Sequence, residues 1–438
     1  MKNFFLLFSA AVVSAGLAVP TVDNVEIAQD ANRVVRISYD LHDGPAIVTF
    51  DVTTNGVSPA GGAFDRSWGD VNKLVTNETG RFTIRWLPPE GSFDDVIAAG
   101  DIAAEVRAWS PDSPPDYAVF DMECASNVYW YSSVERLPGG IGSARYRKEM
   151  LAMRRIHAAG VRWRMGSPTW QPGERVATNE TPRWVTLSED YYVSVFELTQ
   201  GQYVRLWGST SSGWTIEGIK SGSSLGACNT NFCSDADLFP LSAVPRTELR
   251  GSAAQGFAWP GNGHDVSSDV FLGRLRMRTG FEFDMPTHAQ WEYACRAGQG
   301  AGIYNGRELH TTSGIAADGS LTNIAWYAGN LLSGLYKKAP VGMLDPNDWG
   351  LYDMLGNVWE YVLDRQDGPR SGTEVTDPTG PATGSVYIQV GSAYYQGNGL
   401  LRCAYYRSIA ENSSGTDYGY RLCCPVNRTW KTPVTVVE

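Results

Sequence analysis

The spacing of apolar residues limits the fold most, because it differs between the two parts of the chain. Before about Pro115, apolar and polar residues alternate in four short segments: "RVVRISYDL" (Arg33 to Leu41), "AIVTFDVTTNG" (Ala46 to Gly56), "RFTIRW" (Arg81 to Trp86) and "IAAEVRAWS" (Ile102 to Ser110). A period of two, interrupted by Gly, Pro, Asn and Asp, is typical of antiparallel strands with one buried face. We therefore expect an immunoglobulin-like antiparallel β-sandwich over residues 19–115. No titratable cluster occurs there, which favours a spacer or adhesion module.

The alternation ends at "SPDSPPD" (Ser110 to Asp116), where consecutive prolines stiffen the chain and predict a linker. Beyond it, long connections rich in Gly, Asn and Trp separate few regular elements. Two segments predict helices. Leu198 to Gly208 has Thr199 as its cap and an apolar face, and Thr287 to Gly298 begins at an N-cap Thr and ends at Gly. In the second helix we expect one apolar side, made by Trp291, Ala294 and Cys295. The fold class expected for the whole chain is α+β.

The first eighteen residues predict export. Lys2 is followed by an apolar run from Phe4 to Val13, and small residues at Gly16 and Ala18 suit a signal peptidase. The run is too short to span a membrane, and no other stretch is long enough. We expect residues 1–18 to be a signal peptide and the mature protein to be secreted or periplasmic, with no insertion into a membrane.

The net charge limits the classes of binding partner, and the cysteine content indicates which disulfides can form. The formal net charge is −11 and no basic run occurs, which argues against nucleic acid and anionic membrane surfaces as partners. Seven cysteines in an exported chain can form disulfides, with at least one left over or joined to another molecule. Cys228 and Cys233, in "CNTNFC", are spaced for a local bridge.

Five ordered segments resemble the formylglycine-generating enzyme, or sulfatase-modifying factor, family. They are "RRIHAAGVRWRMGS" (Arg154 to Ser167), "VTLSEDYYVSVFELTQGQYVRLWG" (Val185 to Gly208), "MPTHAQWEYACRAG" (Met285 to Gly298), "NDWGLYDMLGNVWEYVLD" (Asn347 to Asp364) and "YGYRLCCPV" (Tyr418 to Val426). Several motifs in order are more specific than one short pattern. The resemblance implies a C-type-lectin-like domain over residues 117–438, with a small twisted sheet, two helices and much ordered loop.

The same resemblance implies a copper-dependent oxidase whose Cu(I) is held by two thiolates, the ligands a soft ion prefers. The matching positions here are Tyr395 and Asn398, and no cysteine occurs between Cys295 and Cys403. Ser392 and Trp359 match active-site positions of the family. We therefore expect no copper and no oxidase activity. A related iron-dependent branch needs a histidine cluster, whereas the five histidines here are scattered.

Two further expectations come from the resemblance. The family binds calcium at positions matching Asp353, Gly356, Val358 and Glu360, two by side chain and two by backbone oxygen, which suits a cation that takes six to eight oxygens. The alternative is a turn held by an Asn hydrogen bond. A second family calcium site would begin at Asn323 and Ile324, but its later acidic ligand is not evident.

Cysteines of the family that match Cys295 and Cys403 form a disulfide, which we expect here. A second family disulfide should be absent, because its positions hold Arg278 and Leu422. One of the adjacent Cys423 and Cys424 is a candidate partner for Cys124.

Two classes of function stay open. The first is a binding or scaffold protein that presents aromatic loops to a glycan or protein ligand, with Tyr394, Tyr395 and Tyr405 at the rim of the family cleft. The alternative is an enzyme, either a divergent formylglycine-generating enzyme or one with other chemistry in the same cleft.

Overall fold

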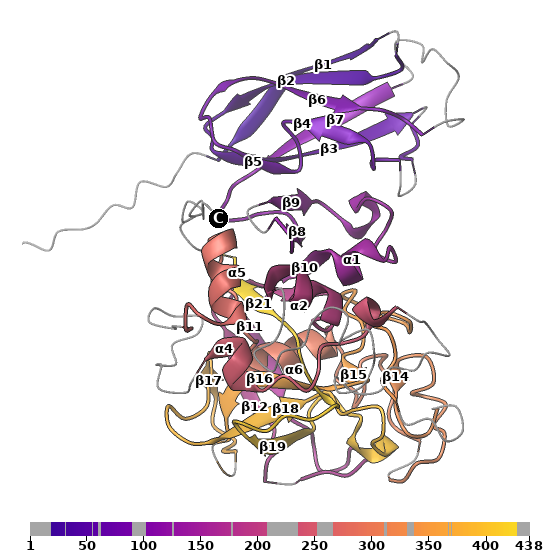
Figure 1. Ribbon diagram of the computed structural model, residues 1–438, viewed down its shortest axis with the longest axis vertical. Coiled ribbons are helices and arrows are strands. Elements are labelled where there is room, and N and C mark those ends of the chain that lie inside the picture. Colours follow the sequence, from indigo (N-terminus) through magenta and orange to yellow (C-terminus); the bar gives the residue numbers. More distant parts are fainter. Residues whose placement is uncertain are drawn as a thin grey trace, which may run out of the picture. The chain divides into compact units, whose positions relative to one another are not determined.

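The computed structural model describes residues 19–426 except for 31, 55, 60–62, 90–101, 125–126, 177, 208–234, 252–265, 311–312, 331–336, 367 and 369. The predicted signal peptide and the bridge between Cys228 and Cys233 lie outside the described residues. The chain divides into two compact units, Met1–Ser58 with Ser67–Pro111, and Pro59–Arg66 with Asp112–Glu438. Strands outnumber helices among the described elements (Figure 1), and the fold is of the mixed α+β class.

The first unit consists of two antiparallel sheets. One has the order β1 (Thr21–Gln29), β2 (Val35–His42), β6 (Gly80–Trp86), β4 (Ser67–Gly69), and the other the order β5 (Lys73–Val75), β3 (Ala46–Thr54), β7 (Ile102–Trp109). Alternate residues of β2 are fully buried, namely Val35, Ile37, Tyr39 and Leu41. The period-two pattern of the sequence therefore marks real strands with one buried face.

The second unit holds four sheets among its described residues. The largest has the order β21 (Cys423–Pro425), β13 (Tyr191–Ser194), β10 (Met150–Ile156), β8 (Tyr117–Asp121), β9 (Val128–Tyr131). The next has the order β19 (Tyr406–Ala410), β18 (Val386–Val390), β16 (Trp359–Arg365), β20 (Tyr418–Tyr420). The others are β11 (Val161–Met165), β12 (Arg183–Leu187), β17 (Val375–Thr376), and β14 (Ala325–Trp326) with β15 (Leu355–Gly356).

Both predicted helices form. They are α2 (Gln200–Trp207) and α6 (His288–Arg296). Thr287 caps α6 in a capping box with Gln290, and Ala297 and Gly298 adopt positive φ at its end. All nine residues of α6 are buried, including Trp291, Ala294 and Cys295, for which we expected one apolar side. Its polar residues are therefore buried as well, and Arg296 donates to Glu292 at 2.9 Å.

Further short helices occur in the second unit. They are α1 (Arg145–Lys148), α4 (Arg246–Arg250), α5 (Phe271–Thr279) and the 3₁₀ turns η1 (Val134–Arg136), η2 (Ala236–Leu238) and η3 (Asn398–Leu400). The sequence did not indicate α5, because Gly273 interrupts its apolar pattern. A Cβ at Gly273 would collide with the backbone of Ser267, so the close approach of these segments requires glycine. Among the described residues, no helix has the length and apolar character needed to cross a membrane.

Candidate functional site

The two aromatic and acidic motifs of the sequence meet at one buried carboxylate. Glu360 on β16 accepts a 2.6 Å hydrogen bond from Nε1 of Trp291 on α6. Both Glu360 oxygens also face Arg421, at 3.0 Å from its Nε and 2.8 Å from its Nη2. All three side chains are essentially inaccessible to solvent. This centre is therefore a charge pair between Glu360 and Arg421, held in place by the indole of Trp291.

Two more buried carboxylates surround this pair. Glu197 accepts from Nδ2 of Asn357 at 2.7 Å and from the amide of Val358 at 3.2 Å. Burial, followed by the negative charges of Asp353 and Glu360, raises the pKa of Glu197 well above its ordinary value. Burial also raises the pKa of Asp353 to about 6, although its Oδ2 accepts a 2.6 Å bond from the amide of Gly342. This region carries more buried acids than Arg421 alone can neutralise.

The predicted calcium ligands Asp353, Gly356, Val358 and Glu360 lie in this region. Both oxygens of Glu360 are taken by Arg421 and Trp291, so Glu360 does not fit a calcium ligand in this arrangement. Within the described ranges, no group of three or more His, Cys, Asp or Glu side chains is placed to hold a metal. The unneutralised acids Glu197 and Asp353 are the feature that suits a divalent cation. Calcium at Asp353, Gly356, Val358 and Glu360 therefore stays a prediction.

The turn between these acids is fixed by close backbone packing. Gly356 has a φ of +86°, and a Cβ there would collide with the backbone of Trp326 on the parallel neighbour β14. The side chain of Asn357 holds the turn from within, donating to Glu197 and accepting from the amide of Ala339 at 2.9 Å. An Asn-held turn, the alternative to calcium, is thus present in this structure.

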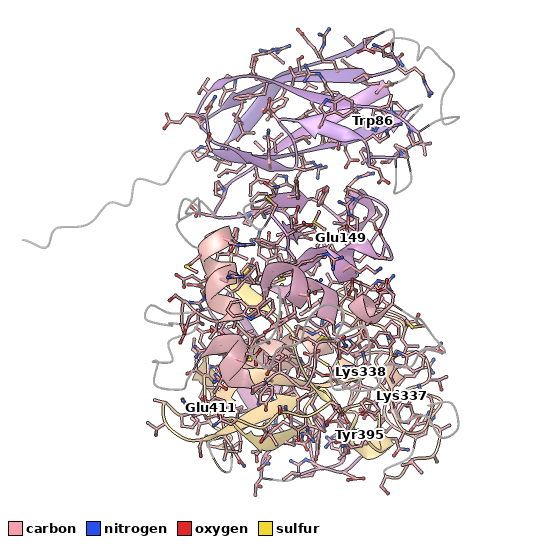
Figure 2. The ribbon with its side chains drawn as sticks, viewed as in Figure 1. Trp86, Glu149, Lys337, Lys338, Tyr395 and Glu411 are labelled. Carbon is pink, nitrogen blue, oxygen red and sulfur yellow. The ribbon has the colours of Figure 1, made fainter. Side chains whose placement is uncertain are left out.

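The residues predicted from the family cleft gather around an arginine that the sequence did not single out. Tyr395, labelled in Figure 2, donates from its hydroxyl to Oδ2 of Asp417 at 2.8 Å and is 38% exposed. Nη2 of Arg407 lies 3.3 Å from the same oxygen. The Arg407 guanidinium stands 4.2 Å from the ring centroid of Trp359 and 4.7 Å from that of Tyr418. Arg407 thus links the partly exposed Tyr395 to the buried Trp359.

Other predicted cleft residues join this group through ring contacts. The centroid of Tyr405 lies 6.1 Å from that of Trp359, and the rings of Tyr394 and Tyr395 meet edge to face at 5.3 Å. We call Tyr394, Tyr395, Tyr405, Arg407 and Asp417 the tyrosine surface. Asn398, the second position matched to a copper ligand, is buried in η3, and its amide nitrogen donates to the carbonyl of Gly314 at 2.9 Å.

Two buried polar atoms near this group have no hydrogen-bond partner among the described residues. They are Oγ of Ser392 and Nε1 of Trp359. Ser392 also adopts a φ of +70°, which is unusual for a residue other than glycine. Unpaired buried polar groups and strained backbone are each costly, and they occur more often at functional positions than elsewhere.

The predicted disulfide partners lie side by side. Cys295 on α6 and Cys403 are both fully buried, and their thiols are in hydrogen-bonding contact without being joined. Arg278 and Leu422 occupy the positions of the second family bridge. The structure therefore brings the pair together, and the bond itself stays a prediction.

Taken together, the α+β fold and these buried motifs define a domain like that of formylglycine-generating enzymes, preceded by antiparallel sheets. Residues 155–425 match the family model described as the sulfatase-modifying factor enzyme 1-like domain. The chain belongs to this family.

Individual relatives are distant. The chain is 30% identical to the mouse formylglycine-generating enzyme over 146 residues, which are 31% of this chain and 38% of the relative. It is 31% identical to that of Streptomyces coelicolor over 134 residues, 30% of this chain and 42% of the relative. A protein named chaperone protein LppX, from Paenibacillus barcinonensis, is 26% identical over 43% of this chain and 66% of its own length. The chain thus spans about two fifths of the length of the first two.

Two solved structures match over most of their own length at low identity. Treponema denticola variable protein 1 is 21% identical, covering 63% of this chain and 95% of its own, with a TM-score of 0.46. PvdO from Pseudomonas aeruginosa is 19% identical, covering 63% of this chain and 94% of its own, with a TM-score of 0.44.

Proposed function

We propose that this protein is an exported, non-catalytic member of the family that binds a glycan or protein ligand through the tyrosine surface. The observation that carries the proposal is the environment of Tyr395, which stands where the family has a copper cysteine. Its hydroxyl is committed to Asp417, and Asp417 to Arg407. A phenol in a hydrogen-bonded network is a poor ligand for Cu(I), whereas it suits stacking and polar contacts with a ligand.

The other cysteines do not replace the missing thiolates. Cys295, Cys403, Cys423 and Cys424 are fully buried. Burial raises the pKa of Cys423 and of Cys424, so both stay protonated thiols. A buried thiol can neither capture a substrate cysteine nor exchange copper with solvent, which supports a loss of oxidase chemistry.

The remaining parts of the proposal concern export and the first unit. The segment 1–18 supports secretion or transfer to the periplasm. The two antiparallel sheets of the first unit support an immunoglobulin-like spacer, and the loop-rich second unit supports a C-type-lectin-like domain. Both architectures commonly carry binding functions on their loops.

A second candidate is an enzyme that uses the same cleft for other chemistry. It is favoured by the unpaired Oγ of Ser392 and Nε1 of Trp359, because such groups are available to a substrate or a developing charge. The first candidate ranks higher because, within the described part of the chain, no base is hydrogen-bonded to the Ser392 hydroxyl.

Oxidation of a sulfatase-type cysteine peptide tests the first candidate against a divergent formylglycine-generating enzyme. Copper-loaded protein is incubated with the peptide under oxygen, and the aldehyde is measured by mass, with free copper as the reference. We expect no aldehyde above the reference, and clear turnover would overturn the proposal. Binding is tested by capture from a glycan array and from secreted proteins. Tyr395→Ala should abolish it, while Trp170→Ala, which removes an aromatic side chain that is 70% exposed elsewhere, should not.

A further inference from the structure

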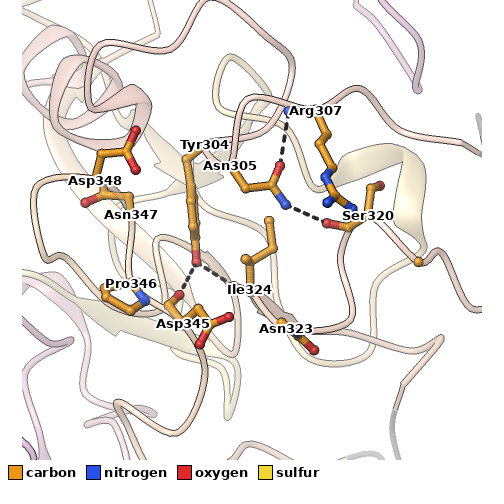
Figure 3. A pocket seen from close by; sticks show the side chains of 11 residues that line it. Tyr304, Asn305, Arg307, Ser320, Asn323, Ile324, Asp345, Pro346, Asn347 and Asp348 are labelled. Carbon is orange, nitrogen blue, oxygen red and sulfur yellow. Dashed lines mark hydrogen bonds between the residues drawn. The ribbon is translucent and has the colours of Figure 1, made fainter.

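A separate polar cavity opens on the second unit, away in sequence from the tyrosine surface. Its volume is about 360 Å³, within the range of small-molecule sites. Three segments line it, each from a different loop: 304–307, 319–324 and 345–348. Figure 3 shows Arg307 and Ser320 at the right of the cavity, Asp348 at the left and Asp345 at the bottom. Its mouth is open, because Arg307, Asn323, Asp345 and Asp348 are all exposed.

The floor of the cavity is rigid. The hydroxyl of the buried Tyr304 lies 2.7 Å from the carbonyl oxygen of Ile324 and 3.0 Å from that of Asp345. The amide of Asp345 donates to the carbonyl of Asn323 at 2.8 Å, and Nδ2 of Asn305 to that of Ser320 at 2.9 Å. These bonds join all three segments, so the cavity is formed before any ligand arrives, which lowers the cost of binding.

Several side chains at the wall are not used by the protein. Within the described residues, no hydrogen bond or ion pair involves the side chain of Arg307, Asn323 or Asp345. They offer a guanidinium, a carboxamide and a carboxylate to one small volume. Asp348 is partly used, since its Oδ2 accepts from Nε2 of Gln299 at 2.6 Å.

We propose that this cavity binds a neutral sugar residue of a glycan. A sugar ring carries hydroxyls that donate and accept in several directions, which matches a carboxylate acceptor at Asp345, a donor at Arg307 and a group that does both at Asn323. Tyr304 and Ile324 are buried at the floor, and the partly exposed Pro346 supplies an apolar contact for the carbon face of a sugar. The cavity accommodates one such ring with its hydroxyls.

The charges of the wall disfavour other small ligands. Two carboxylates against one guanidinium repel phosphate and acidic sugars. A divalent cation requires a converging set of oxygens, and no such group of acidic side chains occurs in the described ranges. A free amino acid would use only Asp345 and Arg307 and leave the amide of Asn323 without a role.

The experiment uses the full mature chain and methyl glycosides of glucose, galactose, mannose and N-acetylglucosamine, with binding followed by saturation-transfer NMR and calorimetry. We expect at least one to bind. Asp345→Asn, which keeps the shape but removes the charged acceptor, should weaken it about tenfold or more, and Asn323→Ala should weaken it as well. Asp269→Asn is the matched control, because it removes an exposed aspartate outside the cavity and should leave affinity unchanged.

The outcomes separate this inference from the proposed function. Sugar binding that survives Tyr395→Ala but is lost in Asp345→Asn supports the cavity as a site of its own. Sugar binding lost in Tyr395→Ala and kept in Asp345→Asn overturns the cavity and leaves the tyrosine surface standing. No binding of any glycoside, or tighter binding of glycine, glutamate or calcium at Asp345, also overturns it. Unchanged melting curves for the variants exclude a folding defect.

Discussion

Arg421 and Glu360 form an ion pair with no access to solvent, in which Nη2 of the arginine lies 2.8 Å from Oε1 of the glutamate. Arg421 also donates to the carbonyls of Ser194 and Tyr352, each at 2.8 Å. One guanidinium thus ties β13, β16 and the turn before β15 together. A buried ion pair adds little net stability compared with a pair of apolar residues in its place. Removing only one partner is costly, because it leaves the other charge buried without compensation.

Glu360→Gln should therefore destabilise the second unit strongly. We expect a loss of about 3–5 kcal/mol in the free energy of unfolding, measured by urea denaturation. Glu374→Gln is the control, since Glu374 pairs with Arg162 at 2.8 Å on the exposed surface. It should not move the midpoint. If Glu360→Gln and Glu374→Gln had the same urea midpoint, the charge of Arg421 would be neutralised by another group when Glu360 is lost.

Asp353 should make the second unit less stable as the pH rises. Its pKa is raised by burial from 3.8 to about 6, so the unfolded chain gives up this proton at lower pH than the folded one. The contribution is fully present below about pH 4 and is lost as the pH passes through 6. At pH 7.5, with a chelator present, Asp353→Asn should stabilise the protein by about 2–3 kcal/mol. Asn also tolerates the φ of +55° at this position. A parallel pH profile for parent and variant would contradict the shift.

Calcium should reverse that effect if it binds at the predicted positions. A ligand held only by the native state adds about 2.7 kcal/mol at a hundredfold excess over its Kd. Calorimetry of the parent with calcium and with chelator should show a higher Tm with the ion. Neither Asp353→Ala nor Glu360→Ala should respond to it. If the parent has the same Tm with calcium and with chelator, calcium does not bind at these positions and Asn357 alone holds the turn.

The thiols of Cys295 and Cys403 should join when the protein is exported into an oxidising compartment. Their bond would close a loop of about 108 residues and contribute about 4–5 kcal/mol in the chain-entropy model. Peptide mapping without reduction should recover the linked peptides, and reduction should lower the Tm. Cys124→Ser should leave both results unchanged. Recovery of the two peptides as free thiols from protein secreted by its host would sink the prediction.

Local signals in the sequence were reliable, and distant pairings were not. The capping box of α6 uses residues three apart, so Thr287 and Gln290 could be read directly. In contrast, Trp291 and Glu360 are 69 residues apart, and Arg421 is another 61 beyond Glu360. Nothing in the sequence motif around Glu360 indicates that both of its carboxylate oxygens will pair with an arginine. The same holds for Arg407 and Asp417, whose meeting at Tyr395 depends on the pairing of β18 with β19.

The prolines after Ser110 do not act as a free hinge along their whole length. The hydroxyl of Tyr192 donates to the carbonyl of Pro115 at 2.5 Å, and Nη1 of Arg155 to that of Pro114 at 2.6 Å. Residues 59–66 belong to the second unit as well, where the carboxylate of Asp65 accepts from the amide of Gly139 at 2.7 Å. The second unit, which carries the family match, therefore includes residues 59–66, although these lie between two segments of the first unit in the sequence. An engineered exchange of the first unit for another module would therefore have to keep residues 59–66, or Gly139 would lose its bond to Asp65.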